Sequence, residues 1–325
     1  MRDCTECGGT GKVGGYICTK CAGHGKQPDA KVNDLHSSTS RGQHSRDIYL
    51  LHNQPFSLFS MMVRFTYALG RTSADPATVG VHLENKLVDH HRDENLAEDY
   101  LLNINPKGQV PALTGPKLPA PLTDSVDISY WLCGHYPKLL PPDHESTIRD
   151  MFRKLHDIPI FTLSARRDSM PPEWLANGIP PTAVDALLAR PDSEISPAYR
   201  RALENKREFH NKTKADALLP DQVQLAESQA QSYFSELLAI YQAHGGCSLW
   251  LFGPRVGPTL LDAHTVPVIA RLLDERVKRH DLVPAKLQEY AIRVMMLPEW
   301  HSVMHGRPTV WNASLGPVRD LDPLW

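Results

Sequence analysis

The 325-residue sequence has no long hydrophobic run, no large excess of charge of one sign and only two cysteines beyond its first 21 residues. No stretch approaches the roughly 18 apolar residues of a membrane-spanning helix, and the opening residues, MRDCTECGG, lack the apolar core of a secretory signal. The formal net charge of −2 provides no basic field for nucleic acid. These absences predict a soluble, cytoplasmic protein with no nucleic-acid or membrane partner.

The other four cysteines lie in two related units that read CTECGGTG (residues 4–11) and CTKCAGHG (residues 18–25). Both follow the pattern CxxCxGxG, and two such pairs supply four thiolates for a tetrahedral Zn²⁺. The glycines permit tight turns that aim backbone N–H groups at sulfur. We therefore predict zinc ligation by Cys4, Cys7, Cys18 and Cys21; His24 as a replacement ligand, or a redox pair, are the alternatives.

Hydrophobic patterning predicts how the rest of the chain is organised. Residues 26–46 are polar and predict a flexible linker. The pattern then indicates strand 48–51, helix 58–69 ending at Gly70, strand 79–89, helix 94–103, two short strands in VPAL and PLT, and helix 124–136. Beyond about Ser146 it is helical throughout. The predicted domains are a zinc module at 1–25, the linker at 26–46, a βαβαββα domain at 47–140 and an all-helical domain at 146–325.

Three sequence motifs fall, in chain order, on these predicted strands and helices. GQVPAL (108–113), LTDSVDISYWL (122–132) and LFGPRVGPTLLDAHTV (251–266) together resemble the glutathione S-transferase family over about residues 47–310. The resemblance implies an α+β fold in which a thioredoxin-like, glutathione-binding domain precedes an all-α domain. The first 25 residues resemble the DnaJ cysteine-rich repeats, with two repeats in place of four.

The family resemblance also implies where glutathione binds. It implies a cis bond before Pro111, which turns the backbone groups of Val110 outward to pair with the cysteinyl backbone of glutathione, as an added strand would. Gln109 is implied as a side-chain contact. Asp124 and Ser125 begin a helix, where unpaired N–H groups favour an anion, and they would hold the γ-glutamyl end. The alternative is that Pro111 only shapes a turn and that Asp124 and Ser125 only cap a helix.

The same resemblance places Ser57 at the catalytic position, through the pattern Ser-x-x-x-x-x-Val-Arg over residues 57–64. A serine there would donate a hydrogen bond to the glutathione sulfur, whereas a cysteine would favour thiol transfer. Ser57 is equally suited to be a plain N-cap. Asn53, His52 and Ser60 are the alternative catalytic residues.

Two further features concern the ends of the predicted site. The basic residue that the family usually carries near the second helix for the glycyl carboxylate is missing from ENLAEDYLLN, and Lys107, His91 or Arg92 are candidates to replace it. Thr259 and Asp262 resemble the family's capping box, which serves folding. An electrophile pocket is expected beside Phe56 and Phe59, with substrate identity decided by the insertion at about 158–196.

The sequence thus predicts a serine-type glutathione transferase. Glutathione and Zn are the predicted cofactors, and a homodimer is the predicted assembly. The reaction would be conjugation or isomerisation of a small, apolar electrophile. The alternative is a non-catalytic, glutathione-fold binding or regulatory protein that uses the zinc module to dock a partner.

Overall fold

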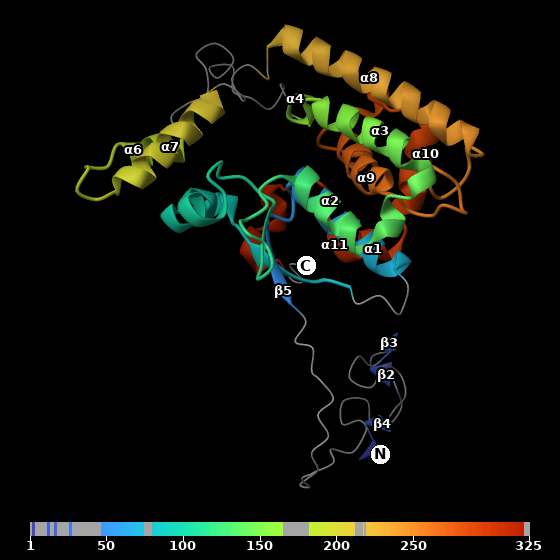
Figure 1. The fold of residues 1–325 in the computed structure, drawn as a ribbon, viewed down its shortest axis with the longest axis horizontal. Helices are drawn as coiled ribbons and strands as arrows, with labels where there is room; N and C mark the ends of the chain where they lie inside the picture. Colours follow the sequence, from blue (N-terminus) through green and yellow to red (C-terminus); the bar gives the residue numbers. More distant parts are fainter. Residues whose placement is uncertain are drawn as a thin grey trace. The chain divides into compact units, whose positions relative to one another are not determined.

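The computed structural model describes residues 47–74, 80–164, 182–211, 217 and 219–321, and the backbone of four short strands before residue 28. The chain divides into two compact units, Met1–Ser45 and Arg46–Trp325 (Figure 1). None of the described helices is both long and apolar enough to cross a membrane.

The first unit contains two antiparallel strand pairs. One joins β1 (Arg2–Asp3) to β4 (Lys26–Gln27), and the other joins β2 (Lys12–Val13) to β3 (Tyr16–Ile17). In the sequence, residues 4–11 lie between β1 and β2, and residues 18–25 lie between β3 and β4. Cys4, Cys7, Cys18, Cys21 and His24 themselves lie outside the described residues.

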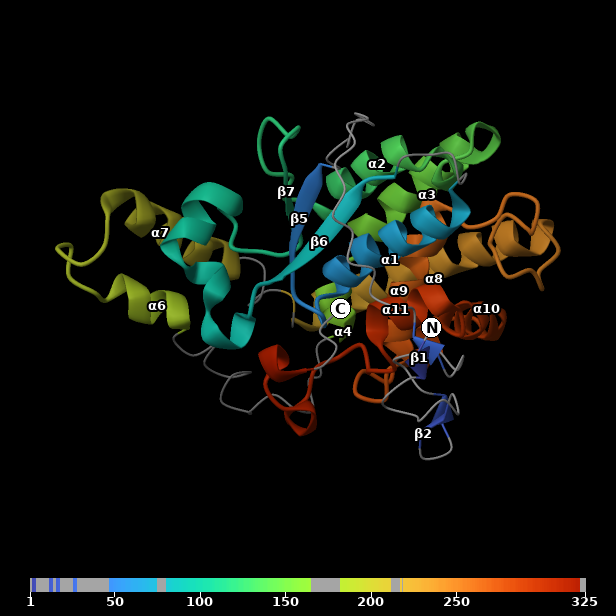
Figure 2. The same cartoon turned by 90° about the horizontal axis from the view of Figure 1, so that it is seen from below.

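The second unit is built on a three-stranded sheet in the order β6-β5-β7 (Figure 2). The central strand β5 (Ile48–Asn53) pairs in parallel with β6 (His82–Leu87) and antiparallel with β7 (Ala112–Thr114). The helix α1 (Leu58–Ser73) is the crossover between the two parallel strands. The parallel pair and its antiparallel neighbour are those expected of a thioredoxin-like sheet.

The fourth strand expected at PLT is reduced to a single bridge. Leu122 exchanges both backbone hydrogen bonds with Leu113, at 2.8 and 3.0 Å. Pro121 has no N–H to donate, and Asp124 already caps α2 (Ser125–His135). The chain therefore has no room for a longer strand between them.

The predicted helix 94–103 is also broken. The segment forms the 3₁₀ turns η1 (His90–Arg92) and η2 (Glu94–Leu96) and the π turn η3 (Tyr100–Ile104). Ala97, with φ −57° and ψ 143°, lies outside the helical region of the backbone between η2 and η3. Leu96 and Leu101 are five residues apart, which a regular helix places on different faces, whereas this break lets both join one apolar cluster.

That cluster is completed by an insertion from the second half of the chain. The helices α6 (Ala183–Leu188) and α7 (Pro197–His210) pack on η2 and η3, through Val184, Tyr199 and Leu203 (Figures 1 and 2). The Tyr199 hydroxyl donates to the Leu96 carbonyl at 2.7 Å. Residues far apart in the sequence thereby frame the same side of the sheet domain.

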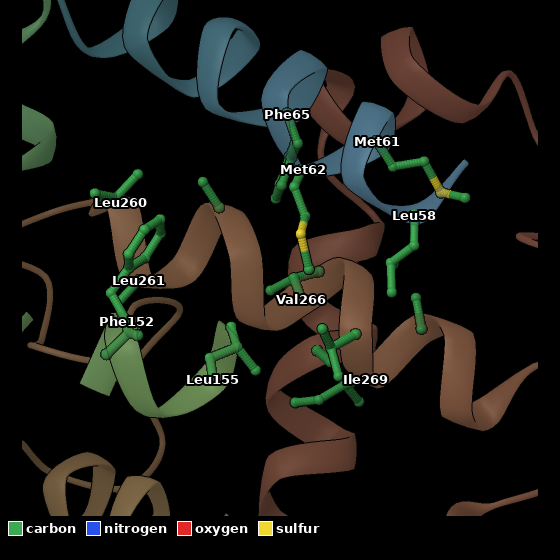
Figure 3. Close-up of a cluster of buried hydrophobic side chains, with 14 of the residues drawn as sticks. Leu58, Met61, Met62, Phe65, Phe152, Leu155, Leu260, Leu261, Val266 and Ile269 are labelled. Carbon is green, nitrogen blue, oxygen red and sulfur yellow. The ribbon is translucent and has the colours of Figure 1, made fainter. Parts of the chain in front are cut away.

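The main core lies between α1 and the helices that follow the sheet domain. α3 (Glu145–Asp157) and α9 (Leu260–Leu273) pack on each other, and α9 also packs along α1. Figure 3 shows Met62 of α1 directed at Val266 of α9. The sequence of α9 is apolar on nearly every side, as a helix buried on all faces requires.

The other elements are α4 (Ile160–Ser164), α8 (Pro220–Ala243), α10 (Ala285–Met295), α11 (Pro298–Met304), η4 (Pro137–Leu139), η5 (Pro142–His144), η9 (His280–Leu282), η10 (Ala313–Leu315) and η11 (Val318–Asp320). As predicted, the described residues after 146 form no strand.

The prediction that α1 ends at Gly70 is wrong, because the helix continues to Ser73. A Cβ atom at Gly70 would lie 2.6 Å from Cδ2 of Tyr136, closer than real side chains approach. Tyr136 is the C-cap of α2 and is buried. Gly70 is therefore explained by the close contact of α1 with the end of α2, and not by helix termination.

Candidate functional site

The loop before Pro111 is held by hydrogen bonds from the side chains of Asn105 and Tyr100. Asn105 accepts the Lys107 N–H through Oδ1, and its amide donates to the Gln109 carbonyl at 2.8 Å. The Tyr100 hydroxyl donates to the same carbonyl at 2.7 Å. Gly108 has φ 57°, and a Cβ there would lie 2.9 Å from the Asn95 carbonyl. The NPKG turn thus needs its glycine both for conformation and for space.

Val110 follows this loop and has different hydrogen bonding. The Val110–Pro111 bond is cis. The carbonyls of Lys107, Gly108 and Gln109 all accept side-chain hydrogen bonds. In the described part of the chain, neither the N–H nor the C=O of Val110 has a partner. The loop therefore presents one peptide edge that an extended backbone can pair with.

A cavity of about 400 Å³ opens beside this edge. It brings together Ser57, Gln109 and Val110, which the sequence predicts as site residues. Its other described lining residues are His90, Asp93, Asn95, Leu96, Gly108, Thr182, Ala183, Val184, Lys206, Phe209 and His210. A second cavity, of about 480 Å³, lies among α1, β6 and α11, and none of the predicted site residues line it.

Ser57 is the N-cap of α1. Its side-chain oxygen accepts the Ser60 N–H at 3.4 Å, which is long for such a bond. The Ser57 hydroxyl hydrogen has no acceptor among the residues the structure describes. The hydroxyl is therefore available to donate into the cavity, at the helix end where backbone N–H groups favour negative charge.

Asp124 and Ser125 occupy the corresponding position on α2. Asp124 is exposed, and its Oδ1 accepts the Val126 N–H at 2.8 Å as the N-cap. Ser125 is the first residue of the helix and is buried. Neither lines the 400 Å³ cavity. Capping and ligand binding are compatible at Asp124, because the other carboxylate oxygen keeps its acceptor capacity.

The structure does not bring the alternative catalytic residues into this cavity. Asn53 is fully buried, and its amide donates to Asn85 Oδ1 at 2.8 Å and to the Leu51 carbonyl at 3.0 Å. Ser60 is fully buried within α1. His52 pairs with Thr114 Oγ1 across β5 and β7 at 3.1 Å, and burial lowers its pKa to about 4.

None of the three candidates for the glycyl carboxylate lines the cavity either. Lys107 and Arg92 are exposed, and the ring of His91 packs on Trp311. The cationic side chain that does line it is Lys206 of α7, the one lysine or arginine among the described lining residues. Its Nζ donates to the carbonyls of Lys107 and Gly108, at 2.6 and 2.9 Å. No local sequence pattern links residue 206 to residue 108.

Phe56 and Phe59, expected beside an electrophile pocket, have different environments. Phe56 is buried, whereas Phe59 is 42% exposed on the first turn of α1. The Phe59 ring stacks with the ring of His156 from α3, with 6.1 Å between centroids. His156 is also near enough to Asp124 for that carboxylate to act on its pKa. His156 thus contacts the first turn of α1 through Phe59 and lies near Asp124, the N-cap of α2.

The described residues contain no group of three or more side chains suited to a metal ion. The four predicted zinc ligands lie outside them. Thr259 and Asp262 form a reciprocal capping box at the start of α9, and Asp262 also accepts from the Tyr290 hydroxyl at 2.6 Å. The capping box is the structural feature that the sequence predicts.

No protein-family model matches the sequence, and no curated protein matches it. Solved structures of glutathione enzymes are similar at low identity. A maleyl pyruvate isomerase, described as a bacterial zeta-class glutathione S-transferase, is 18% identical with a TM-score of 0.49, over 81% of this chain and 99% of its own. A glutathione transferase F2 from Populus trichocarpa is 18% identical with a TM-score of 0.46, over 80% and 98%. A beta-etherase from Sphingobium is 16% identical with a TM-score of 0.49, over 79% and 98%. These TM-scores lie below 0.5, so they say nothing of what this chain does, and its function is inferred from its own residues.

Proposed function

We propose that this protein is a serine-type glutathione transferase. The observation that carries the proposal is the cavity in which the unpaired peptide edge of Val110 meets the hydroxyl of Ser57. A tripeptide thiol can extend along Val110 by backbone pairing, and this places its sulfur near a donor at a helix N-terminus. Ser57 then stabilises the thiolate of the ligand, which is the nucleophile.

The two ends of glutathione are assigned to different elements. The γ-glutamyl end is held by Asp124 and Ser125 at the start of α2, where the amine meets a carboxylate and the α-carboxylate meets unpaired N–H groups. The glycyl carboxylate lies toward Lys206, which carries the positive charge in the cavity wall. The second substrate is a small, apolar electrophile beside Phe59. As the sequence predicts, we expect a homodimer.

Calorimetric titration of the full chain with glutathione tests the site. Asp124→Ala should weaken binding by about 1–3 kcal/mol, the loss expected for a hydrogen bond to a charged group. Asp127→Ala, an exposed acidic residue on the same helix, is the matched control and should bind normally. Equal affinity of the two variants would contradict the assignment of Asp124, and no glutathione binding in the unsubstituted chain would contradict the function.

The alternative function is glutathione binding without turnover. The hydrogen bond that the Ser57 side-chain oxygen accepts from the Ser60 N–H is the observation that favours it, because this contact already gives the side chain a role as the N-cap of α1. A screen of electrophiles with the glutathione-bound protein separates the two functions. Binding with no product from any electrophile class would favour the non-catalytic protein.

We further propose that the first unit binds one Zn²⁺ through Cys4, Cys7, Cys18 and Cys21. The strand registers support this, because Asp3 pairs with Lys26 and Lys12 pairs with Ile17. In the sequence, each cysteine unit therefore starts one residue after a paired strand and ends one residue before another. Zinc bound here would contribute folding energy, as structural sites of this kind do. Metal analysis of the protein purified without chelator should give one zinc per chain, and its absence would overturn the proposal.

A further inference from the structure

A chain of three hydrogen-bonding side chains joins three helices near the proposed site. The hydroxyl of Ser129 on α2 lies 2.8 Å from Nε2 of His264 on α9. Nδ1 of His264 lies 3.0 Å from Nε2 of His156 on α3. Ser129 and His264 have no exposed surface, whereas His156 is only partly buried. Glutathione binding as proposed above uses none of these groups.

The hydrogens in this chain can be ordered in two ways. In the first, Ser129 donates to His264, His264 donates from Nδ1 to His156, and His156 carries its own hydrogen on Nδ1. In the second, every direction is reversed and the Ser129 hydroxyl hydrogen needs another acceptor. The described residues offer Ser129 no other partner than His264. The first order leaves no buried hydrogen unpaired, so it is the more stable one.

The remaining nitrogen of His156 faces away from the chain of hydrogen bonds. Its Nδ1 has no hydrogen-bond partner among the described residues, and it is not one of their buried unpaired atoms, so solvent reaches it. The ring lies against Phe59, two residues after Ser57. Burial lowers the pKa of His156 to about 4, against an opposing effect of Asp124. At neutral pH the side chain is therefore an uncharged imidazole that presents an N–H group beside Phe59, on the first turn of α1.

We propose that His156 is a catalytic residue that donates a hydrogen bond from Nδ1 to the carbonyl oxygen of an α,β-unsaturated carbonyl substrate. Ser129 and His264 are positioning residues that fix this tautomer. The inference rests on the proposed function, because the glutathione thiolate is the nucleophile. It narrows the electrophile from any small, apolar molecule to a class that develops negative charge on oxygen.

The reaction is an addition that needs no oxidant or reductant. The thiol first loses its proton to water. The sulfur lone pair then forms a C–S bond at the β carbon, the C=C π pair moves between the α carbon and the carbonyl carbon, and the carbonyl π pair moves onto oxygen. His156 stabilises this enolate, since a fixed donor is most effective where charge develops. Water finally protonates the α carbon, which completes the addition of S–H across the double bond.

The test compares two electrophiles in the full chain. One is a conjugated ketone, and the other is an alkyl iodide, which develops no charge on oxygen. His156→Phe keeps ring packing but removes the donor, and it should lower the ratio of kcat/KM for the ketone to kcat/KM for the iodide by about 100-fold. His156→Asn retains an amide donor near the Nδ1 position and should restore much of the ratio. Arg153→Gln, exposed one turn earlier on α3, should leave the ratio unchanged.

The tautomer is tested without turnover. Nitrogen-15 NMR of the imidazole at pH 7 should show His156 as the neutral Nδ1–H tautomer, and Ser129→Ala should increase the population of the other tautomer. Finding the Nε2–H tautomer in the unsubstituted chain would overturn the inference. So would an unchanged rate ratio in His156→Phe, or turnover of the iodide but not the ketone. Each of these results leaves the proposed function intact, whereas failure to bind glutathione overturns both.

Discussion

Ser57 combines two hydrogen-bonding roles in one hydroxyl group. Its oxygen accepts the Ser60 N–H, which caps α1, and its hydrogen is available to a ligand sulfur. Removing the oxygen costs stability in the first role and transition-state stabilisation in the second. The two losses differ in size and are measured separately.

Ser57→Ala should lower turnover of glutathione with an established electrophile by roughly 10- to 1,000-fold, because one donor to the thiolate is lost. It should lower the free energy of unfolding by only about 1 kcal/mol. Steady-state kinetics and urea unfolding measure the two effects. Ser196→Ala removes a comparable cap, on α7, and should leave turnover unchanged. Full turnover in Ser57→Ala, with unchanged absorbance of the bound thiolate, would make Ser57 a cap only.

At the scale of elements, two residues have roles that their neighbours in the sequence do not indicate. Contacts with other elements explain both. Gly70 has the sequence context of a helix terminator but lies inside α1, against the ring of Tyr136. Lys206 lies on a helix of the second half of the chain, yet it binds the carbonyls of Lys107 and Gly108 in the loop before Pro111. Both residues depend on how one element packs on another.

Gly70→Ala should destabilise the protein by about 1–3 kcal/mol, because the added methyl group overlaps a buried ring. This outweighs the gain of up to about 1 kcal/mol that alanine has over glycine in a helix. Gly134→Ala, in α2 with nothing within 4 Å of the added carbon, should instead be stabilising. Urea unfolding of both variants checks the sign, and stabilisation of Gly70→Ala would show that the ring of Tyr136 moves aside.

Lys206→Met should weaken glutathione binding by roughly 10- to 100-fold, the loss expected for a charge-assisted contact. Arg207→Met, on the exposed side of the same helix, is the control and should bind normally. The monoethyl ester of the glycyl carboxylate separates binding from loop stability. The unsubstituted protein should prefer glutathione to the ester, and Lys206→Met should bind both alike. A preserved preference in that variant would show that Lys206 only supports the loop.

Across the whole molecule, three histidines, two of them buried and His156 partly buried, link stability to pH. Burial lowers the pKa of His52 and His156 to about 4 and that of His264 well below its usual value. The unfolded chain binds protons on these residues near pH 6.5, whereas the folded chain does not. Their contribution to stability is therefore complete above pH 6.5 and is lost as the pH falls towards 4.

Urea unfolding at several pH values should show a free energy that falls between pH 6.5 and 4. The slope from each histidine is at most about 1.4 kcal/mol per pH unit. Between pH 7.5 and 8.5 these histidines should contribute no slope, which is the internal control. Stability that stays constant from pH 6.5 to 5 would contradict the burial of three neutral histidines.

Short stretches of sequence specify several helix starts and the turn before Pro111. The N-caps Ser57 and Asp124, the capping box of Thr259 and Asp262, and the glycine of NPKG act within about four residues of themselves. Such signals depend on local backbone geometry, so the sequence by itself determined the order of the strands, the starts of α1, α2 and α9, and the loop before Pro111.

The tertiary structure alone decided the walls of the proposed site. Ser129 and His264 are 135 residues apart in the chain, His156 and His264 are 108 apart, and Lys206 is 98 residues from the Gly108 carbonyl it binds. The break in the predicted helix 94–103 likewise lets Leu96 and Leu101 pack with α6 and α7, which are distant in the sequence. Local propensity extends over a few residues, whereas these contacts exist only once burial of the shared core has brought distant helices together.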